Sequence, residues 1–157
     1  MTPAITLAEK QAVSHQVHSY SHDPNCESYG DEAAQALNIN PGQVYKTLMV
    51  ALNGDNKQLA VAIVPVAAQL NLKAAAKAFK VKKIAMADPQ AAQRSSGYLL
   101  GGISPLGQKK ALPTLLDSSA ENWPTVFVSA GKRGLEIELQ ATDLLLLSKG
   151  QFADLTG

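Results

Sequence analysis

Apolar residues recur along the chain at two spacings, and these spacings divide it into short strands and short helices. Two nearly continuous apolar runs, at residues 44–52 and 58–64, are separated by Gly54-Asp55-Asn56, which predicts a hairpin of buried strands. A second hairpin is predicted where residues 123–129 and 135–139 alternate between apolar and polar. Further strands are expected at 16–20, 81–85 and 113–117, and a glycine-punctuated strand and loop at 98–107.

Capping residues mark where helices are expected to begin. Thr2, Asn71 and Asp88 stand just before helix-forming segments, and proline follows two of them at the first helical position, where no amide hydrogen is needed. The predicted helices cover residues 4–13, 30–37, 72–79, 89–94 and 141–147. Strands dominate the middle of the chain in hairpins and irregular steps. We therefore predict one α+β domain over residues 1–157, with a mixed, partly closed β-sheet or barrel and peripheral helices.

The composition fits an ordinary globular protein and excludes several other classes. The chain has 157 residues, 46% of them hydrophobic, which is enough to bury one substantial core. It has no apolar run near the roughly 20 residues of a membrane-spanning helix. It also shows no signal-peptide pattern, and its single cysteine cannot form an internal disulfide. We therefore expect a cytoplasmic protein with no membrane partner.

The charge pattern argues against a protein that grips nucleic acid unaided. The formal net charge is only +1, so a nucleic-acid contact should be local or shared with a partner. A set of lysines in the middle of the chain favours a solvated face, although such a set can also follow a phosphate backbone. These are Lys73, Lys77, Lys80, Lys82, Lys83, Lys109 and Lys110.

Lys46 is the most unusual residue of the first hairpin. It lies in the apolar run 44–52, on the strand face that also carries Leu48 and Val50. A lysine on such a face is unfavourable unless its ammonium reaches solvent, is paired or meets a ligand. Two interpretations stay open from this spacing alone: a lysine that snorkels from the wet end of the strand, or one that serves a binding site.

The second hairpin places a hydroxyl and a carboxylate opposite each other. A tight turn at residues 132–133 would pair Ser129 with Glu136 on one face of the sheet and Ala130 with Leu135 on the other. Cross-strand neighbours are close enough to meet one small ligand. The alternative is that the acidic residues of this strand are only the solvated face of an amphipathic strand.

Three other constellations do not support a cofactor. Residues 102–109 half-resemble a phosphate-binding loop, but glutamine occupies the lysine position and proline removes a backbone donor. His15, His18 and His22 lie close in sequence without the spacing of a metal site. Cys26 has no evident base to activate it. We therefore expect no cofactor and no metal, and we keep a reactive Cys26 as an alternative.

Six short motifs, spread over nearly the whole chain, carry a resemblance to a known family. They are Tyr29-Gly30-Asp31-Glu32, Gln43-Val44-Tyr45-Lys46-Thr47-Leu48, Ala92-Gln93-Arg94-Ser95, Gly97-Tyr98-Leu99, and the longer runs 101–110 and 128–135. In this order they resemble the YbaK family of freestanding aminoacyl-tRNA deacylases, which are related to the editing domain of bacterial prolyl-tRNA synthetase. The resemblance implies a barrel-like mixed sheet with surrounding helices. It also implies an enzyme that removes cysteine from mischarged proline tRNA in partnership with prolyl-tRNA synthetase.

The resemblance also implies roles for individual residues. It makes Lys46 the catalytic residue, and the family pattern has aspartate where this chain has Glu136. It implies that the cysteine leaves as a cyclic thiolactone after its own thiol attacks the ester, with release by water as the alternative. A non-catalytic module that binds aminoacyl or adenylate groups, and a hydrolase dependent on Cys26, are the rival interpretations. It places the family's substrate-site tyrosine on Tyr20 and the serine and glycine of its late hairpin on Ser129 and Gly131. We also expect Tyr29, Gly101 and Glu136 to bind substrate.

Overall fold

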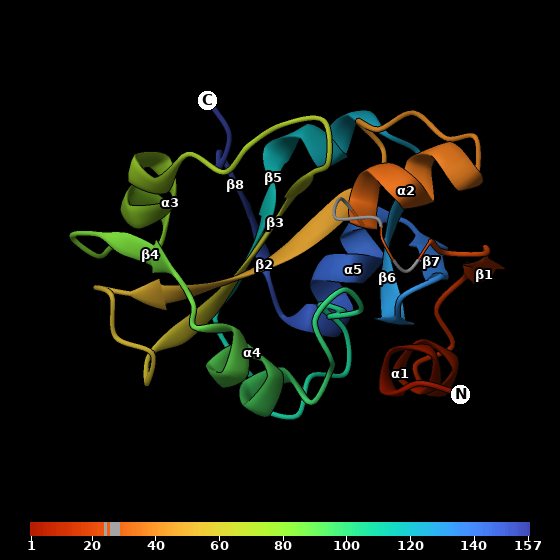
Figure 1. The fold of residues 1–157 in the computed structure, drawn as a ribbon. Helices are drawn as coiled ribbons and strands as arrows, with labels where there is room; N and C mark the ends of the chain where they lie inside the picture. The colour runs from red at the N-terminus through yellow and green to blue at the C-terminus, as the bar shows by residue number, and fades with distance from the viewer. Residues whose placement is uncertain (24, 26–28) are drawn as a thin grey trace.

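The computed structural model describes residues 1–23, 25 and 29–157, and for Tyr29 and Gly30 only the backbone. These residues form five α-helices, one 3₁₀ helix and eight strands in two sheets (Figure 1). The helices are α1 (Pro3–Lys10), α2 (Tyr29–Ala36), α3 (Leu72–Ala78), α4 (Pro89–Ser96), η1 (Ser118–Asn122) and α5 (Ala141–Ser148). The strands are β1 (His15–Ser19), β2 (Tyr45–Leu52), β3 (Leu59–Pro65), β4 (Ile84–Met86), β5 (Thr114–Asp117), β6 (Val126–Lys132), β7 (Leu135–Leu139) and β8 (Gln151–Ala153).

Three helices begin at the capping residues that the sequence predicts. The side chain of Thr2 accepts a hydrogen bond from the backbone of the first turn of α1, and Asn71 and Asp88 do the same for α3 and α4. The first helix ends at Lys10, earlier than predicted, and Ala12 just beyond it has a φ of 55°. In the described part of the chain, no helix is both long enough and apolar enough to cross a membrane.

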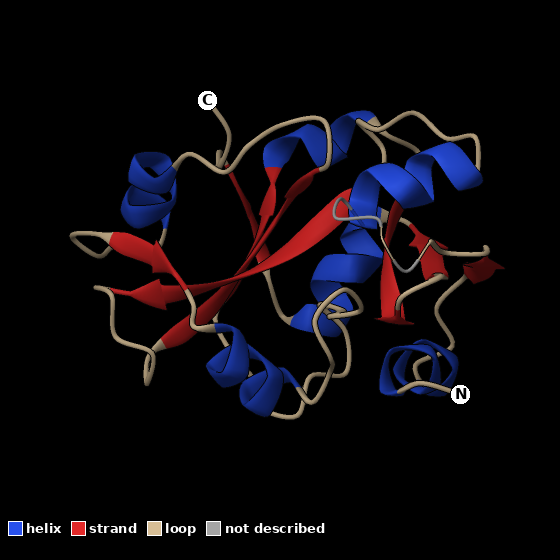
Figure 2. Ribbon diagram, in the orientation of Figure 1, coloured by secondary structure: helices blue, strands red, loops and turns tan. Residues whose placement is uncertain are grey.

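The larger sheet has five strands in the order β4-β2-β3-β5-β8. Strand β2 runs antiparallel to β3 and β4, whereas the pairs β3–β5 and β5–β8 are parallel. All seven residues of β3 are buried, because helices cover both faces of this sheet (Figure 2). Helix α3 packs on one face through Ala75 and Ala76, and α5 packs on the other through Leu144. Burial on both faces explains why β3 is a continuous apolar run rather than an alternating one.

The smaller sheet has three antiparallel strands in the order β1-β7-β6. It meets the larger sheet at the residues just before β2. The Phe127 amide of β6 donates to the Gln43 carbonyl at 3.0 Å, and Val44 forms an isolated parallel bridge with Phe127. The predicted α+β fold with a mixed sheet is confirmed, and the two sheets do not close into a continuous barrel.

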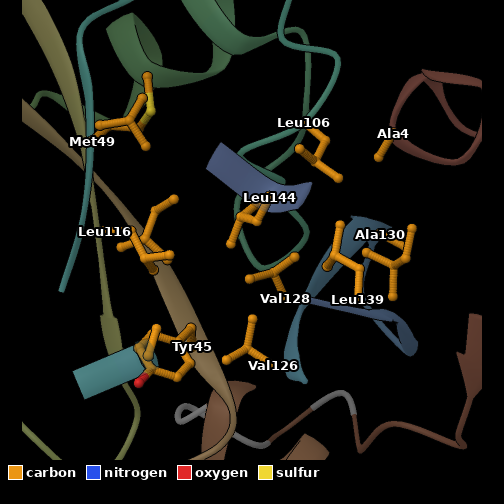
Figure 3. Packing of buried hydrophobic residues seen from close by; sticks show 14 of the residues in the cluster. Ala4, Tyr45, Met49, Leu106, Leu116, Val126, Val128, Ala130, Leu139 and Leu144 are labelled. Atoms are coloured by element: carbon orange, nitrogen blue, oxygen red, sulfur yellow. The ribbon is translucent and has the colours of Figure 1, made fainter. Parts of the chain in front are cut away.

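The main core lies between the two sheets. Val128 and Leu139 project into it from the smaller sheet, and Tyr45 and Leu116 project from the larger one (Figure 3). Leu144 of α5 is completely buried among them. This shared core fixes the position of one sheet relative to the other, and so it determines which residues meet where the sheets join.

Residues 98–107 form a loop rather than the predicted strand and loop. Local bonds take the place of strand pairing: the Tyr98 hydroxyl donates to the Leu106 carbonyl at 2.6 Å, and the Ser104 hydroxyl accepts from the Leu106 amide. Such hydrogen bonds from side chains to the backbone compete with the hydrogen bonds that would pair this segment with a neighbouring strand. Strand β8 was missed, because its three residues show no alternation and are held by parallel pairing with β5.

The late hairpin has a bulge that the sequence did not predict. Leu135 is opposite Lys132, not Ala130, and the register shifts between Ser129 and Lys132. Gly131 lies in this irregular stretch with a φ of 104°, a left-handed conformation that glycine adopts without strain. The tight turn is at residues 133–134 rather than 132–133.

Candidate active site

A cavity of about 560 Å³ lies where the two sheets meet, at the start of β2. This volume suits a small ligand or the end of a larger one. Its lining combines segments that are far apart in the sequence: the end of β1, α2, the start of β2, the chain after β3, the loop after α4, and the β6–β7 hairpin. The lining residues are Tyr20, Asp31, Val44, Tyr45, Lys46, Thr47, Leu48, Val66, Ala67, Ala68, Gln69, Leu100, Gly101, Ile103, Ser129 and Glu136.

Lys46 contributes the positive charge of this cavity. It is the second residue of β2, opposite Val64 of β3, and its side chain is half-buried. Leu48 and Val50, on the same face of the strand, belong to the apolar cluster beneath α3. Neither ion pair of the described residues involves Lys46. Lys46 therefore lines the cavity from the start of β2 and has no ion-pair partner among the described side chains.

Glu136 contributes a buried acid. It lies on β7, the central strand of the smaller sheet, between His18 of β1 and Ser129 of β6. Its side chain is 7% exposed, and burial raises the pKa of its carboxyl to about 8. It is therefore not part of a solvated strand face. It lines the cavity together with Lys46, but no ion pair in the described part of the chain joins the two.

Ser129 brings a hydroxyl to the cavity, directly opposite Glu136. The hydroxyl oxygen accepts a hydrogen bond from the Gly131 amide at 3.1 Å, so its proton remains for another acceptor. Gly131, predicted to bind substrate, is not among the residues that line the cavity. A Cβ at this position would lie 2.7 Å from Tyr98 Cε1. The Gly131 amide therefore holds the Ser129 hydroxyl, while Gly131 itself packs closely against Tyr98.

Tyr20 and Asp31 border the cavity from the side of α2. The Tyr20 amide donates to the Gly134 carbonyl at 2.9 Å, which fixes the residue at the end of β1. Burial raises the pKa of Tyr20, and the nearby carboxylate of Glu136 raises it further. Both side chains belong to residues that line the cavity. Asp31 is exposed and was not predicted as a site residue, whereas the side chain of Tyr29, which was predicted, lies outside the described part of the chain.

The loop after α4 forms another wall. Gly101 lines the cavity together with Leu100 and Ile103. The next residue, Gly102, shows how closely this loop approaches the late hairpin, because an added Cβ would lie 2.8 Å from the Arg133 amide nitrogen. The two long glycine-containing motifs of the sequence therefore pack against each other beside the cavity.

Sequence reasoning missed the wall formed by residues 66–69, which follow β3. The Val66 amide donates to the Val44 carbonyl at 2.8 Å and holds this segment against the start of β2. Thr47 was also missed; its Oγ1 is buried and has no hydrogen-bond partner within the described chain. Small and apolar residues after a buried strand look like an ordinary connection, so no signal in their pattern pointed to a cavity.

The histidines and the cysteine make no site with these residues. His15 Nδ1 lies 2.6 Å from the Val13 carbonyl oxygen, and His18 Nε2 lies 2.9 Å from Glu138 Oε1. Within residues 1–23, 25 and 29–157, no group of three or more His, Cys, Asp or Glu side chains is arranged to hold a metal ion. Cys26, the alternative nucleophile, lies outside the described residues.

Known structures share this fold. A crystal structure described as "a putative trans-editing enzyme for prolyl tRNA synthetase" superposes with a TM-score of 0.83 at 23% sequence identity, covering 100% of this chain and 99% of the other. A hypothetical protein of known structure gives a TM-score of 0.86 at 16% identity, covering 99% and 100%. At these identities the likeness establishes the fold.

Sequence comparison identifies the family. A sequence model described as the aminoacyl-tRNA editing domain matches residues 23–147. A curated relative from Enterococcus faecalis carries the name "Putative Cys-tRNA(Pro)/Cys-tRNA(Cys) deacylase EbsC". It is 36% identical over 155 residues, covering 99% of this chain and 93% of the relative. Because the match extends over most of the chain and includes the segments that surround the cavity, the chain belongs to the aminoacyl-tRNA editing domain family.

Proposed function

We propose that this protein is a trans-editing deacylase that removes cysteine mischarged onto proline tRNA. The observation that carries the proposal is the convergence of Lys46, Glu136, Ser129 and Tyr20 on one cavity between the sheets. Membership of the editing-domain family supports an aminoacyl-tRNA as the substrate. The curated relative named as a deacylase of Cys-tRNA(Pro) and Cys-tRNA(Cys) supports cysteine as the amino acid.

Lys46 is the residue that acts on the ester. An aminoacyl ester is already activated, so the protein mainly has to position it and stabilise the developing oxyanion. The ammonium of Lys46 has no ion-pair partner among the described residues, so it can bind the ester carbonyl oxygen or the terminal phosphate of the tRNA. The Ser129 hydroxyl, whose oxygen is already engaged by the Gly131 amide, offers its proton as a second donor.

Glu136 suits the α-ammonium of the bound amino acid. Burial raises the pKa of this carboxyl to about 8, because its charged form is poorly solvated inside the protein. A substrate ammonium beside it would favour the ionised form and make a charge-assisted hydrogen bond. The carboxylate would then hold the amino acid. Lys46 forms no ion pair with Glu136 and so remains available to contact the ester. Tyr20 would border the same group at the rim of the cavity.

The cysteine of the substrate can supply the nucleophile. Its sulfur attacks the ester carbonyl carbon, and the bond from that carbon to the ribose oxygen breaks. The ribose oxygen takes the thiol proton, so the products are a cyclic thiolactone and a tRNA with a free terminal hydroxyl. This route needs no nucleophile from the protein, and it discriminates chemically, because alanine and serine lack the thiol even where they fit.

Selection of proline tRNA requires more than this cavity. A cavity of about 560 Å³ accommodates the aminoacyl end of a tRNA but not the features that distinguish one tRNA from another. Prolyl-tRNA synthetase, which selects the proline tRNA, would supply that discrimination as a partner. The reaction would take place in the cytoplasm, together with aminoacylation. Adding the synthetase should then raise selectivity for Cys-tRNA(Pro), and equal rates on Cys-tRNA(Pro) and Cys-tRNA(Cys) with and without it would contradict this partnership.

The deciding experiment compares Cys-tRNA(Pro) and Ala-tRNA(Pro) as substrates for wild type, Lys46→Ala and Lys46→Arg. We expect rapid deacylation of the cysteinyl substrate by wild type alone, and a loss of at least about a hundredfold, equivalent to about 2.7 kcal/mol of barrier, in Lys46→Ala. Arginine should rescue poorly, because its planar fork replaces a compact ammonium. Lys10→Ala, which removes an exposed lysine on α1, is the matched control. Circular dichroism checks that each variant is folded.

The runner-up is a non-catalytic module that binds aminoacyl or adenylate groups in the same cavity. The unpaired Lys46 and the buried Glu136 would serve such binding equally well. In that case wild type would retain Cys-tRNA without releasing cysteine, and Lys46→Ala would lower affinity alone. Deacylation by wild type at a rate far above the uncatalysed loss excludes this function.

A further inference from the structure

The basic residues of the chain are concentrated in one part of the sequence. Residues 56–116 contain nine of the 14 lysines and arginines but only one of the 13 acidic residues, Asp88. This stretch includes β3, α3, β4 and α4 (Figure 1). The net charge of +1 therefore hides an uneven distribution along the chain, with positive charge on α3, on α4 and in the turns and loops of this stretch. The nine are Lys57, Lys73, Lys77, Lys80, Lys82, Lys83, Arg94, Lys109 and Lys110.

A second cavity, of about 310 Å³, lies within this basic part, between the β2–β3 turn and α4. We call it the basic cavity. Lys57, Arg94 and Lys110 line it, and no acidic side chain does. All three are exposed, and neither ion pair of the described residues involves them. The basic cavity is therefore a concave site whose positive charge is not neutralised by the described side chains.

Hydrogen bonds hold the walls of the basic cavity together. The Asp88 amide donates to Asn56 Oδ1 at 2.8 Å, which fixes the β2–β3 turn to the start of α4. The Lys110 amide donates to the Ser95 carbonyl at 3.1 Å, which holds the lysine beside the last turn of α4. Ser95 lines the cavity, and its Oγ is buried without a hydrogen-bond partner in the described chain. An anion would supply the acceptor that this hydroxyl lacks.

The nearby carboxylates are engaged with backbone amides. Asp55 Oδ1 accepts from the Lys57 amide at 2.9 Å, and Asp88 Oδ2 accepts from the Ala91 amide at 3.1 Å. Each carboxylate stabilises a turn or a helix start and forms no ion pair with a cation of the lining. An incoming anion would therefore meet three cations without having to displace an internal partner.

We propose that the basic cavity binds a backbone phosphate of the RNA substrate, several nucleotides away from the aminoacyl ester. The inference rests on the proposed function in taking that RNA to be a tRNA; the chemistry of the site itself selects a phosphate. Lys46 lies near one end of β2, and the basic cavity borders the turn beyond the other end, roughly 20 Å away along the strand. An aminoacyl nucleoside in the first cavity cannot reach it, whereas the rest of the tRNA chain can.

Helix α4 connects the two cavities. Arg94 and Ser95 near its end line the basic cavity, and Leu100 and Gly101 just beyond it line the first one. Gln93 Oε1 accepts a hydrogen bond from the Leu100 amide at 2.9 Å, which ties the loop to the helix. A phosphate held at α4 would therefore set the position of the RNA relative to the cavity in which the ester is cleaved.

The test compares the double variant Arg94→Gln/Lys110→Gln with a matched double control, Lys10→Gln/Lys149→Gln, which removes two exposed lysines outside residues 56–116. Affinity for uncharged tRNA is measured over a range of salt concentrations, a readout independent of deacylation. We expect about tenfold weaker binding at low salt, and a slope of log K against log[salt] that is smaller by about two, with no such change in the control. KM for full-length Cys-tRNA should rise by a similar factor at constant kcat. Deacylation of a cysteinyl ester on a short CCA oligonucleotide should be unaffected.

Each other result has a distinct meaning. An equal loss of tRNA affinity in the control variant would show that the lysines and arginines attract tRNA only diffusely, and it would refute a phosphate site in the basic cavity. Unchanged tRNA binding in the double variant would overturn it as well. If inorganic phosphate then still shifted the Ser95 and Lys110 amide resonances of wild type, the ligand would be a free phosphate. If the double variant instead lost the ability of wild type to bind phosphatidylserine vesicles, the ligand of the basic cavity would be a membrane surface. A wild type that binds tRNA through these residues but releases no amino acid would refute the proposed function and support this site.

Discussion

Ser129 and Glu136 are paired directly across β6 and β7, and both line the cavity that also contains Lys46 of the other sheet. The hydroxyl and the carboxyl come from the smaller sheet, and the ammonium comes from the larger one. Neither sheet contains the site alone. The Gln43 and Phe127 backbone contact that joins the sheets therefore also positions the chemical groups of the cavity.

Removal of the Glu136 charge should weaken catalysis more than removal of the charge of Glu138 on the same strand. Glu136→Gln keeps the shape but cannot pair with an α-ammonium, so we expect kcat/KM for Cys-tRNA to fall by about tenfold or more. Glu138→Gln is the matched control. Glu138 bonds His18 at 2.9 Å and Thr125 at 2.6 Å and does not line the cavity, so kcat/KM should change less than about twofold. Equal losses in the two variants would contradict the assignment of Glu136 to the substrate.

The free energy of unfolding should decrease as the pH rises from about 4.5 to about 8, because Glu136 titrates at a higher pH in the folded protein than in the unfolded chain. The carboxyl titrates near 4.5 in the unfolded chain and near 8 in the folded protein. Below pH 4.5 both states are protonated. Between these values only the unfolded chain has lost the proton, so the free energy of unfolding decreases with pH and levels off above about pH 8. Glu136→Gln should reduce this slope in urea titrations at several pH values, and identical slopes would show that Glu136 is not the responsible group.

Cys26 should be dispensable, because the substrate carries its own thiol. Cys26→Ser should keep kcat/KM for Cys-tRNA within about twofold of wild type, and both proteins should act poorly on Ala-tRNA. Single-turnover deacylation assays measure both rates. A loss of more than about a hundredfold in Cys26→Ser, about 2.7 kcal/mol of barrier, would instead support a hydrolase with a cysteine nucleophile.

Gly131 should matter for folding rather than for contact with substrate. An alanine there would adopt a φ of 104° and place its Cβ 2.7 Å from Tyr98 Cε1 and 3.1 Å from Thr2 Cβ. We expect Gly131→Ala to lower the free energy of unfolding by about 2–3 kcal/mol, measured by urea denaturation. Gly42→Ala, whose added Cβ has no contact closer than 3.2 Å, should cost less. An unchanged stability with a raised KM would give Gly131 a direct role in binding.

Local features of the fold could be predicted from the sequence because local interactions determine them. The capping side chains of Thr2, Asn71 and Asp88 act within one helical turn, and the first hairpin follows from two apolar runs on either side of a turn. The pairing of Ser129 with Glu136 was also predicted, but for a partly wrong reason. The turn is one residue later than expected, and the bulge compensates for that shift.

The residue types available for a site could be read from the chain alone: a lysine in an apolar strand, a hydroxyl and a carboxylate in a hairpin, and glycines that allow close approach. Tertiary contacts bring these groups into one cavity, bury Glu136 and pack Gly131 closely against Tyr98. The same holds for the wall at residues 66–69 and for the basic cavity beside α4. No local pattern encodes these features, because the burial of a side chain and its proximity to other groups depend on contacts between segments far apart in the chain.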